Sequence, residues 1–164
     1  MFRKALESDP HFLTAEDRLE NLSSTLVERW HFPPMLYDVF RNKCFESAIC
    51  SCVLEGCCTV LDIGTGTGLL SLMASKRRAR RVYACEALEV MAVTAKDVLV
   101  HNLEGEQVKL IPKLSLDLDQ TDVPEKLTLL VTKTFDLGML GEHVLETMLH
   151  AWRNFLAPGC SSQG

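Results

Sequence analysis

The sequence has no long apolar run and no strong excess of either charge. Its apolar stretches last only a few residues, far short of the roughly 20 that a membrane-spanning helix needs. The start, Met1-Phe2-Arg3-Lys4, leads into charged residues, so we expect no signal peptide. The net charge of −5 gives no support to a membrane-surface or general nucleic-acid role. We therefore expect a cytoplasmic protein, with the nucleus as a second location.

The seven cysteines lack the regular spacing of a disulfide framework or of a zinc site. A structural zinc site needs about four ligands at matched spacings, and the five histidines do not cluster with the cysteines. We expect free thiols that act as small apolar side chains, and no metal.

A basic run, Lys76–Arg81, stands out against the acidic balance of the chain. Positive charge suits the C-terminal end of a helix, where the carbonyl groups are unpaired. A patch for nucleic acid or an acidic partner is the alternative, but no aromatic residues are interleaved with the charges. We favour a solvated helix end.

The 164 residues suffice for one domain with a buried core. Strand-like and helix-like segments alternate with short connections, which predicts an α/β fold around a parallel sheet. The run 127–131 is apolar throughout, as in a strand covered on both faces. The expected strands are 59–63, 81–85, 108–111 and 127–132, and the expected helices are 41–54, 69–76, 87–102 and 143–156.

The N-terminal 29 residues are expected to be helical. Ala5-Leu6, Asp9-Pro10 and Phe12 resemble the junction between two tetratricopeptide helix pairs. Only one such junction is present, so an ordinary amphipathic helix is the alternative. We divide the chain into this segment (1–29), a main domain (30–157) and a polar tail (158–164).

A glycine-rich turn follows the first expected strand and opens a helix. Gly64, Gly66 and Gly68 permit a tight turn and a close approach of a ligand to the backbone. A dinucleotide fingerprint of the form G-x-G-x-x-G would require glycine at position 69, which is leucine. The pattern is instead Asp62-Ile63-Gly64-Thr65-Gly66-Thr67-Gly68, with the acidic residue Glu86 ending the next strand.

This turn resembles motif I of the class I methyltransferases, which bind S-adenosylmethionine. Further segments resemble the protein arginine methyltransferases, namely Met35-Leu36-Tyr37-Asp38, Arg41, Val82-Tyr83-Ala84-Cys85-Glu86 and Leu140-Gly141-Glu142. The resemblance implies a Rossmann-like class I fold that is incomplete at its C-terminal end. It also implies S-adenosylmethionine as cofactor and protein arginine as methyl acceptor.

The resemblance assigns a role to each cofactor residue. Arg41 would pair with the cofactor's carboxylate, Asp62 would fix the loop and the amino group, and Glu86 would hold the ribose. Ser115 would lie near the adenine. The turn residues Gly64, Thr65, Gly66 and Gly68 would line the cofactor.

The chain departs from the family at the acceptor site. The family grips the substrate guanidinium with two glutamates nine residues apart; the second matches Glu142, but Lys133 stands where the first belongs. A lysine there would repel the substrate arginine or neutralise Glu142. Loss of a partner in a desolvated charge pair costs about 2–5 kcal/mol, so we expect weak or no arginine methylation.

The other expectations concern partners and alternatives. Without the fifth strand of the fold, strand 127–132 would present an exposed apolar edge that a partner chain could cover. A cofactor-binding pseudoenzyme or an interaction fragment is the alternative to an arginine methyltransferase. A small-molecule methyltransferase is a third interpretation, since it would keep the cofactor motif without needing the paired loop acids.

Overall fold

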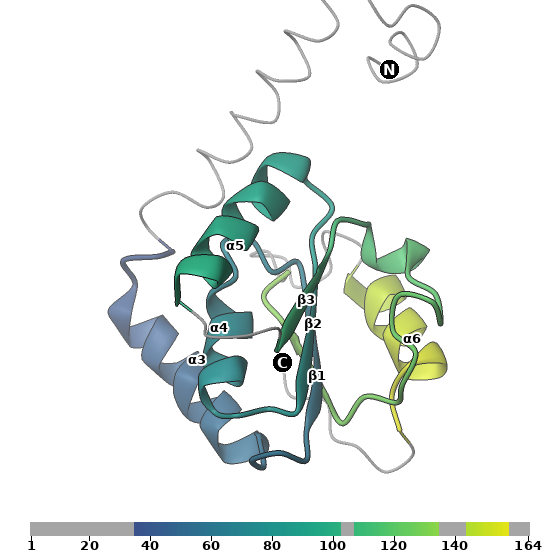
Figure 1. The fold of residues 1–164 in the computed structure, drawn as a ribbon, viewed down its shortest axis with the longest axis horizontal. Helices are drawn as coiled ribbons and strands as arrows, with labels where there is room; N and C mark the ends of the chain where they lie inside the picture. The colour runs from purple at the N-terminus through teal and green to yellow at the C-terminus, as the bar shows by residue number, and fades with distance from the viewer. Residues whose placement is uncertain (1–34, 103–106, 135–143, 158–164) are drawn as a thin grey trace, which may run out of the picture. The chain divides into compact units, whose positions relative to one another are not determined.

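The computed structural model describes residues 35–102, 107–134 and 144–157 (Figure 1). The chain divides into two compact units, Met1–Val39 and Phe40–Gly164, and the second contains the whole sheet. The expected helical segment 1–29, the tail 158–164 and Glu142 lie outside the described residues, so the expectations about them stay predictions.

Within the described residues, the sheet has four parallel strands in the order β3-β2-β1-β4: β1 (Thr59–Ile63), β2 (Arg81–Cys85), β3 (Val108–Ile111) and β4 (Leu129–Thr132). The predicted α/β fold with a parallel sheet is therefore confirmed. The chain moves outward from β1 to β3 and then returns to the other side of β1. Ligands of such sheets bind at this reversal, beyond the carboxyl ends of the strands.

Helices cover both faces of the sheet (Figure 1). One face carries α3 (Val39–Cys52), α4 (Leu69–Lys76) and α5 (Glu89–Asn102). The other face carries α6 (Val144–Asn154) and a short 3-10 helix, η1 (Ser115–Asp117), which contact each other. Burial on both faces of β1 and β4 explains why these strands do not alternate between apolar and exposed polar residues.

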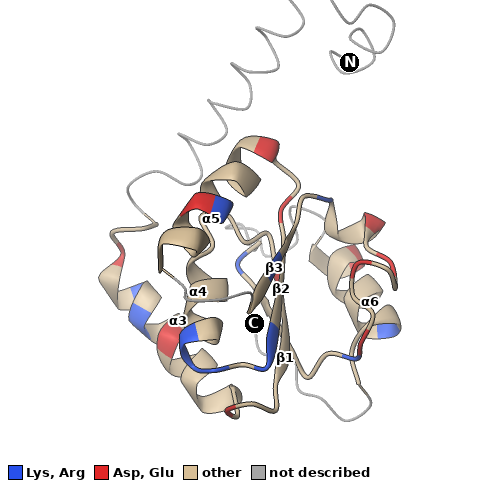
Figure 2. Cartoon of the chain, viewed as in Figure 1, with Lys and Arg blue, Asp and Glu red and all other residues tan. Residues whose placement is uncertain are grey.

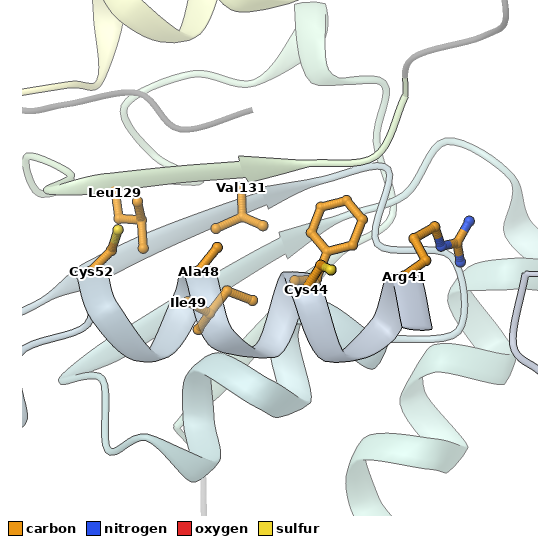
Figure 3. Close-up of a pocket in the computed structure, with 8 residues that line it drawn as sticks. Arg41, Cys44, Ala48, Ile49, Cys52, Leu129 and Val131 are labelled. Carbon is orange, nitrogen blue, oxygen red and sulfur yellow. The ribbon is translucent and has the colours of Figure 1, made fainter. Parts of the chain in front are cut away.

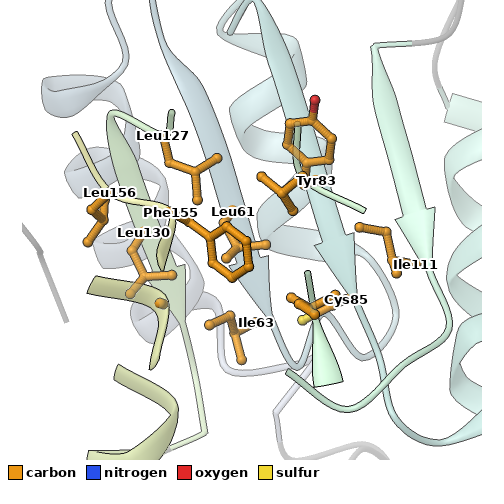
Figure 4. Packing of buried hydrophobic residues seen from close by; sticks show 12 residues of the cluster. Leu61, Ile63, Tyr83, Cys85, Ile111, Leu127, Leu130, Phe155 and Leu156 are labelled. Atoms are coloured by element: carbon orange, nitrogen blue, oxygen red, sulfur yellow. The ribbon is translucent and has the colours of Figure 1, made fainter. Parts of the chain in front are cut away.

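Alternate residues of each strand contribute to two separate cores. Val60 and its neighbour Val82 pack with Ile49 on the face of α3 and α4. Leu61 and Tyr83 point the other way, into a cluster around Phe155 of the C-terminal segment (Figure 4). The alternation follows from the two-residue period of a strand.

Four elements begin or end at residues other than those predicted. Helix α3 spans 39–52 instead of 41–54, and α5 begins at Glu89 instead of position 87. The α5 start is displaced because the Glu86 carboxylate accepts a hydrogen bond of 2.9 Å from the backbone N–H of Leu88. This contact holds the first residues after β2 outside the helix.

The other two differences involve β4 and α6, which have one cause. Strand β4 begins at Leu129 instead of 127, and α6 ends at Asn154 instead of 156. Leu127 and Leu156 instead form an isolated parallel bridge with each other. The Leu127 N–H donates to the Phe155 carbonyl at 3.0 Å, and the Ala157 N–H donates to the Leu127 carbonyl at 2.9 Å.

The apolar run of β4 is covered on both faces, as its sequence predicts. All four residues of β4 are buried. Leu129 and Val131 belong to the core under α3, and Leu130 belongs to the cluster around Phe155. The side chains are covered because helices reach both faces of the last strand. What remains open is the backbone edge, since no strand among the described residues pairs with the outer side of β4.

The basic run takes part in ion pairs within the chain. Figure 2 shows the run as a blue stretch of the ribbon between the end of α4 and the start of β2. Arg78 pairs with Glu55 at 2.8 Å, and Arg80 pairs with Glu125. These contacts agree with the interpretation as a solvated helix end. In the part of the chain that the structure describes, no helix combines the length and the apolar character needed to cross a bilayer.

Candidate functional site

The glycine-rich turn leads from β1 into α4 with three left-handed glycines. Gly64, Gly66 and Gly68 have φ angles of 68°, 58° and 84°, a region that other residues rarely adopt. The N–H groups of Gly64 and Thr65 both donate to the carbonyl of Cys85 at 3.0 Å. The turn is therefore held against the carboxyl end of β2, at the reversal of strand order.

Asp62 lies directly below the turn, buried to 1% exposure. Its Oδ2 accepts hydrogen bonds from the hydroxyls of Thr65 and Ser71, each of 2.7 Å. Its Oδ1 is buried and has no partner. Burial raises the pKa of Asp62 from 3.8 to about 6, even though the two hydroxyl groups lower it. The carboxyl group thus keeps one oxygen available for a further donor.

Glu86 directly follows β2 and holds the turn from the opposite side. Its Oε2 accepts a 2.9 Å hydrogen bond from the N–H of Gly66, and its Oε1 accepts one from Leu88. The side chain is 7% exposed. Two residues singled out from the sequence, 20 positions apart, are therefore in direct contact. The acid is fixed in place by backbone donors on both oxygens.

A cavity of about 230 Å³ opens beside Gly64 and Glu86, and the predicted residues Asp62, Thr65, Gly66 and Gly68 are not among those that line it. Three residues predicted from the sequence line it: Gly64, Glu86 and Ser115. The remaining lining residues are Ile63, Cys85, Ala87, Lys113, Leu114, Leu116, Thr134 and Thr147. Most of them lie at or just beyond the carboxyl end of a strand, which is where the strand order predicts a ligand.

Sequence reasoning missed several polar residues of this region. Ser71 binds Asp62 from the first turn of α4, while Thr134 and Thr147 reach the cavity from the end of β4 and from α6. Thr147 also lies 3.3 Å from the Ser115 hydroxyl. Only the position of Ser71, shortly after the glycine turn, could have drawn attention to it. The threonines belong to no recognisable motif.

Arg41 lines a different cavity, of about 270 Å³, between α3 and β4. Figure 3 shows its guanidinium at the end of α3 that lies toward the carboxyl end of β4. The walls are mostly apolar, with Phe45, Leu129 and Val131 among them. Arg41 therefore shares the correct edge of the sheet but not the first cavity, and its pairing with a cofactor carboxylate stays a prediction.

The acceptor site is only partly described. Lys133 is half-buried and directly follows β4, as predicted. Its expected contact with Glu142 lies outside the described residues. Within the described ranges, no group of three or more His, Cys, Asp or Glu residues could hold a metal ion, and the six cysteines there are free thiols.

Residues 43–134 match the family described as ribosomal protein L11 methyltransferase (PrmA). Protein arginine N-methyltransferase 9 of Mus musculus is 44% identical over 156 residues, covering 94% of this chain and 18% of that protein. The arginine N(omega)-methyltransferase of Streptomyces achromogenes subsp. streptozoticus is 34% identical over 155 residues, covering 93% of this chain and 42% of that protein.

A solved structure, the Trypanosoma brucei PRMT1 enzyme–prozyme heterotetrameric complex with AdoHcy, superposes with a TM-score of 0.69 at 26% identity. The match covers 78% of this chain and 39% of the other. The chain spans about a fifth of the length of the first curated relatives it matches. It belongs to the S-adenosylmethionine-dependent methyltransferase family that the PrmA model describes, and it resembles the protein arginine N-methyltransferases within that fold.

Proposed function

We propose that this chain is the methyl-donor-binding part of a protein arginine N-methyltransferase and that S-adenosylmethionine binds in the 230 Å³ cavity. The observation that carries the proposal is that Gly64, Glu86 and Ser115, predicted separately from three parts of the sequence, line the same cavity. The superposed Trypanosoma brucei complex is one with AdoHcy, which supports the same ligand class.

The residues present fit this cofactor. The unpartnered Oδ1 of Asp62 would accept a hydrogen bond from the ammonium group of the cofactor. A charged carboxylate binds an ammonium group more strongly than a neutral acceptor does. The carboxylate of Glu86 would accept hydrogen bonds from the ribose hydroxyls. The cofactor supplies an electrophilic methyl group on a sulfonium, while the chain's own residues bind and orient it.

Calorimetric titration of S-adenosylmethionine into the purified chain tests the proposal. Loss of the Glu86 charge in Glu86→Gln should weaken binding by about 10- to 100-fold, because hydrogen bonds to charged groups contribute about 1.5–3 kcal/mol. Glu89→Gln, in the first turn of α5, is the matched control and should bind as the unmodified chain does. If the folded unmodified chain did not bind S-adenosylmethionine, the proposal would be wrong.

Gly64→Ala provides a second test with a closely matched control. A Cβ at Gly64 would lie 2.6 Å from a side-chain atom of Thr134, whereas a Cβ at Gly56 would meet nothing within 4 Å. Both glycines have positive φ angles, of 68° and 70°. Gly56→Ala therefore reports backbone strain alone, and only Gly64→Ala should also reduce cofactor affinity.

For the acceptor, we propose that the chain transfers methyl groups to arginine weakly or not at all. Lys133 places a positive charge where the family's first clamp glutamate would meet a guanidinium. The same observation favours a second candidate function, a cofactor-binding protein without catalysis. Methyl transfer to an arginine-rich peptide separates the two, because the second function predicts cofactor binding with no product.

We further propose that the outer edge of β4 pairs with a strand from a partner chain. The Thr128 N–H donates to Thr59 of β1, and the Leu127 N–H donates to the opposite side. By alternation, the N–H groups of Leu129 and Val131 also point away from β1. In hydrogen exchange of the isolated chain these two amides should exchange faster than those of Leu130 and Thr132. A partner strand should protect them.

Two broader assignments complete the proposal. Residues 1–29 would end a tetratricopeptide array, and the protein would act in the cytoplasm, a reducing compartment that suits its free thiols. Imaging of a fluorescent fusion tests the location. Circular dichroism of a peptide covering 1–29, alone and joined to two further repeats, tests the array.

A further inference from the structure

Thr134, which no sequence motif marks, packs directly against the glycine turn. An ideal Cβ built on Gly64 would lie 2.6 Å from the Thr134 Cγ2, closer than real Cβ atoms come to any neighbour. Gly64 therefore lacks a side chain for two reasons, its φ of 68° and the methyl group of Thr134. The contact joins residues 70 positions apart at the mouth of the cavity.

The hydroxyl of Thr134 is held by the neighbouring threonine. Thr132 Oγ1 donates to the carbonyl of Ile63 at 3.0 Å. The Thr134 hydroxyl lies 2.9 Å from that same Oγ1, and because the single Thr132 proton is already used, Thr134 is the donor. The Thr134 N–H adds a longer contact of 3.3 Å. The last residues of β1 and β4 are thereby connected just before the glycine turn.

Thr134 also occupies a particular place along the chain. It lines the cavity together with Gly64 and Glu86. In sequence it follows Lys133 and precedes the segment that carries Glu142. Thr134 thus contacts the glycine turn proposed to bind the methyl donor, and it lies in sequence between Lys133 and Glu142, the two positions of the proposed methyl-acceptor site.

We propose that Thr134 is a positioning residue for cofactor binding: its methyl group limits the movement of the Gly64 turn, and its hydroxyl anchors that methyl group to β4. This inference rests on the proposed binding of S-adenosylmethionine in the cavity.

Two variants separate the two halves of the side chain. Thr134→Ser keeps the hydroxyl and loses the methyl group, and Thr134→Val does the reverse.

Each single substitution should weaken S-adenosylmethionine binding by about threefold to tenfold in calorimetry, with the chain still folded by circular dichroism. The decisive variant is the pair Gly64→Ala/Thr134→Ser. Removing Cγ2 creates space for the new Cβ. The double variant should therefore bind S-adenosylmethionine at least about fivefold more tightly than Gly64→Ala alone. If the Thr134 methyl group did not press on the turn, removing it would not improve binding in this background.

The control pair is Gly56→Ala/Thr134→Ser. Its two changes should act independently, because Gly56 has open space around its Cβ position. If Gly64→Ala/Thr134→Ser also shows simple addition while the unmodified chain binds cofactor, the positioning role is wrong and the proposed function stands. If the folded unmodified chain does not bind cofactor, the proposed function itself is wrong and the positioning role falls with it.

Discussion

The Ser71 hydroxyl donates a 2.7 Å hydrogen bond to Oδ2 of Asp62, while Oδ1 of the same carboxyl group has no partner. The buried acid is thus satisfied on one side only. Burial raises the pKa of Asp62 to about 6. A buried carboxyl oxygen without a partner lowers the stability of the chain without ligand, and it provides an acceptor for a bound cation.

The first prediction concerns stability and pH. Because the pKa of Asp62 is higher in the folded state, about 6 against 3.8, the folded state favours the protonated acid. Its contribution to stability is fully present below pH 3.8 and is lost as pH rises through 6. Two pKa units correspond to an upper bound of about 3 kcal/mol.

Asp62→Asn removes this titration. Chemical unfolding of both proteins should therefore show the difference in unfolding free energy moving in favour of Asp62→Asn between pH 4 and pH 8. The change should be at most about 3 kcal/mol. A difference that stays constant with pH would show that Asp62 titrates normally in the folded chain.

The second prediction concerns binding and pH. A cofactor ammonium should need the ionised Asp62, so affinity for S-adenosylmethionine should fall as pH drops below about 6. The affinity should fall by up to about tenfold per pH unit, because below its pKa the Asp62 carboxyl group must lose one proton before the cofactor binds. Calorimetry across this range provides the measurement. In Asp62→Asn the affinity should be low and should lack this pH dependence.

The third prediction concerns the methyl acceptor. Lys133→Glu restores a carboxylate where the family has one, and methyl transfer to an arginine-rich peptide should rise by at least about tenfold, consistent with 2–5 kcal/mol for a desolvated charge pair. Lys96→Glu, on the exposed side of α5, makes the same charge change away from the site and should have no effect. Glu142→Gln in the Lys133→Glu background should abolish the gain.

The fourth prediction concerns the C-terminal segment. Phe155 is 1% exposed and packs edge-to-face with His150 at 5.6 Å between ring centroids. Phe155→Ala should lower the free energy of unfolding by about 3–5 kcal/mol, because it leaves a cavity between the sheet and α6. Trp152→Ala, at a side chain that is 53% exposed, should change it by less than about 0.5 kcal/mol. Equal effects would contradict the packing in Figure 4.

For the elements with the strongest local signals, the first and last residues could be predicted from the sequence. β1, α4, β2 and β3 begin and end as expected, since each lies between residues whose backbone preferences are local. The left-handed glycines are of the same kind, because their conformation favours glycine whatever surrounds them. The spacing from Gly66 to Glu86 predicted a shared site, and the two residues are hydrogen-bonded.

The boundaries of β4 and α6 could not be predicted in this way. They depend on the bridge between Leu127 and Leu156, whose formation is set by how α6 returns to the sheet. The apolar sequence of β4 predicted that both of its faces are buried, but only the tertiary structure shows that α3 and α6 cover them.

The sequence by itself determined the alternation of strands and helices, the glycine turn and the acidic residues around it. Only the tertiary structure decided which side chains complete the site: the Ser71 hydroxyl bonds to Asp62, and the Thr134 methyl group packs against Gly64. The physical reason is that parallel strands bring together residues far apart along the chain, as in the Thr132 hydrogen bond to Ile63, 69 positions away. Such contacts are made by threonine and serine, residue types that are common everywhere and carry no local signal of their partner.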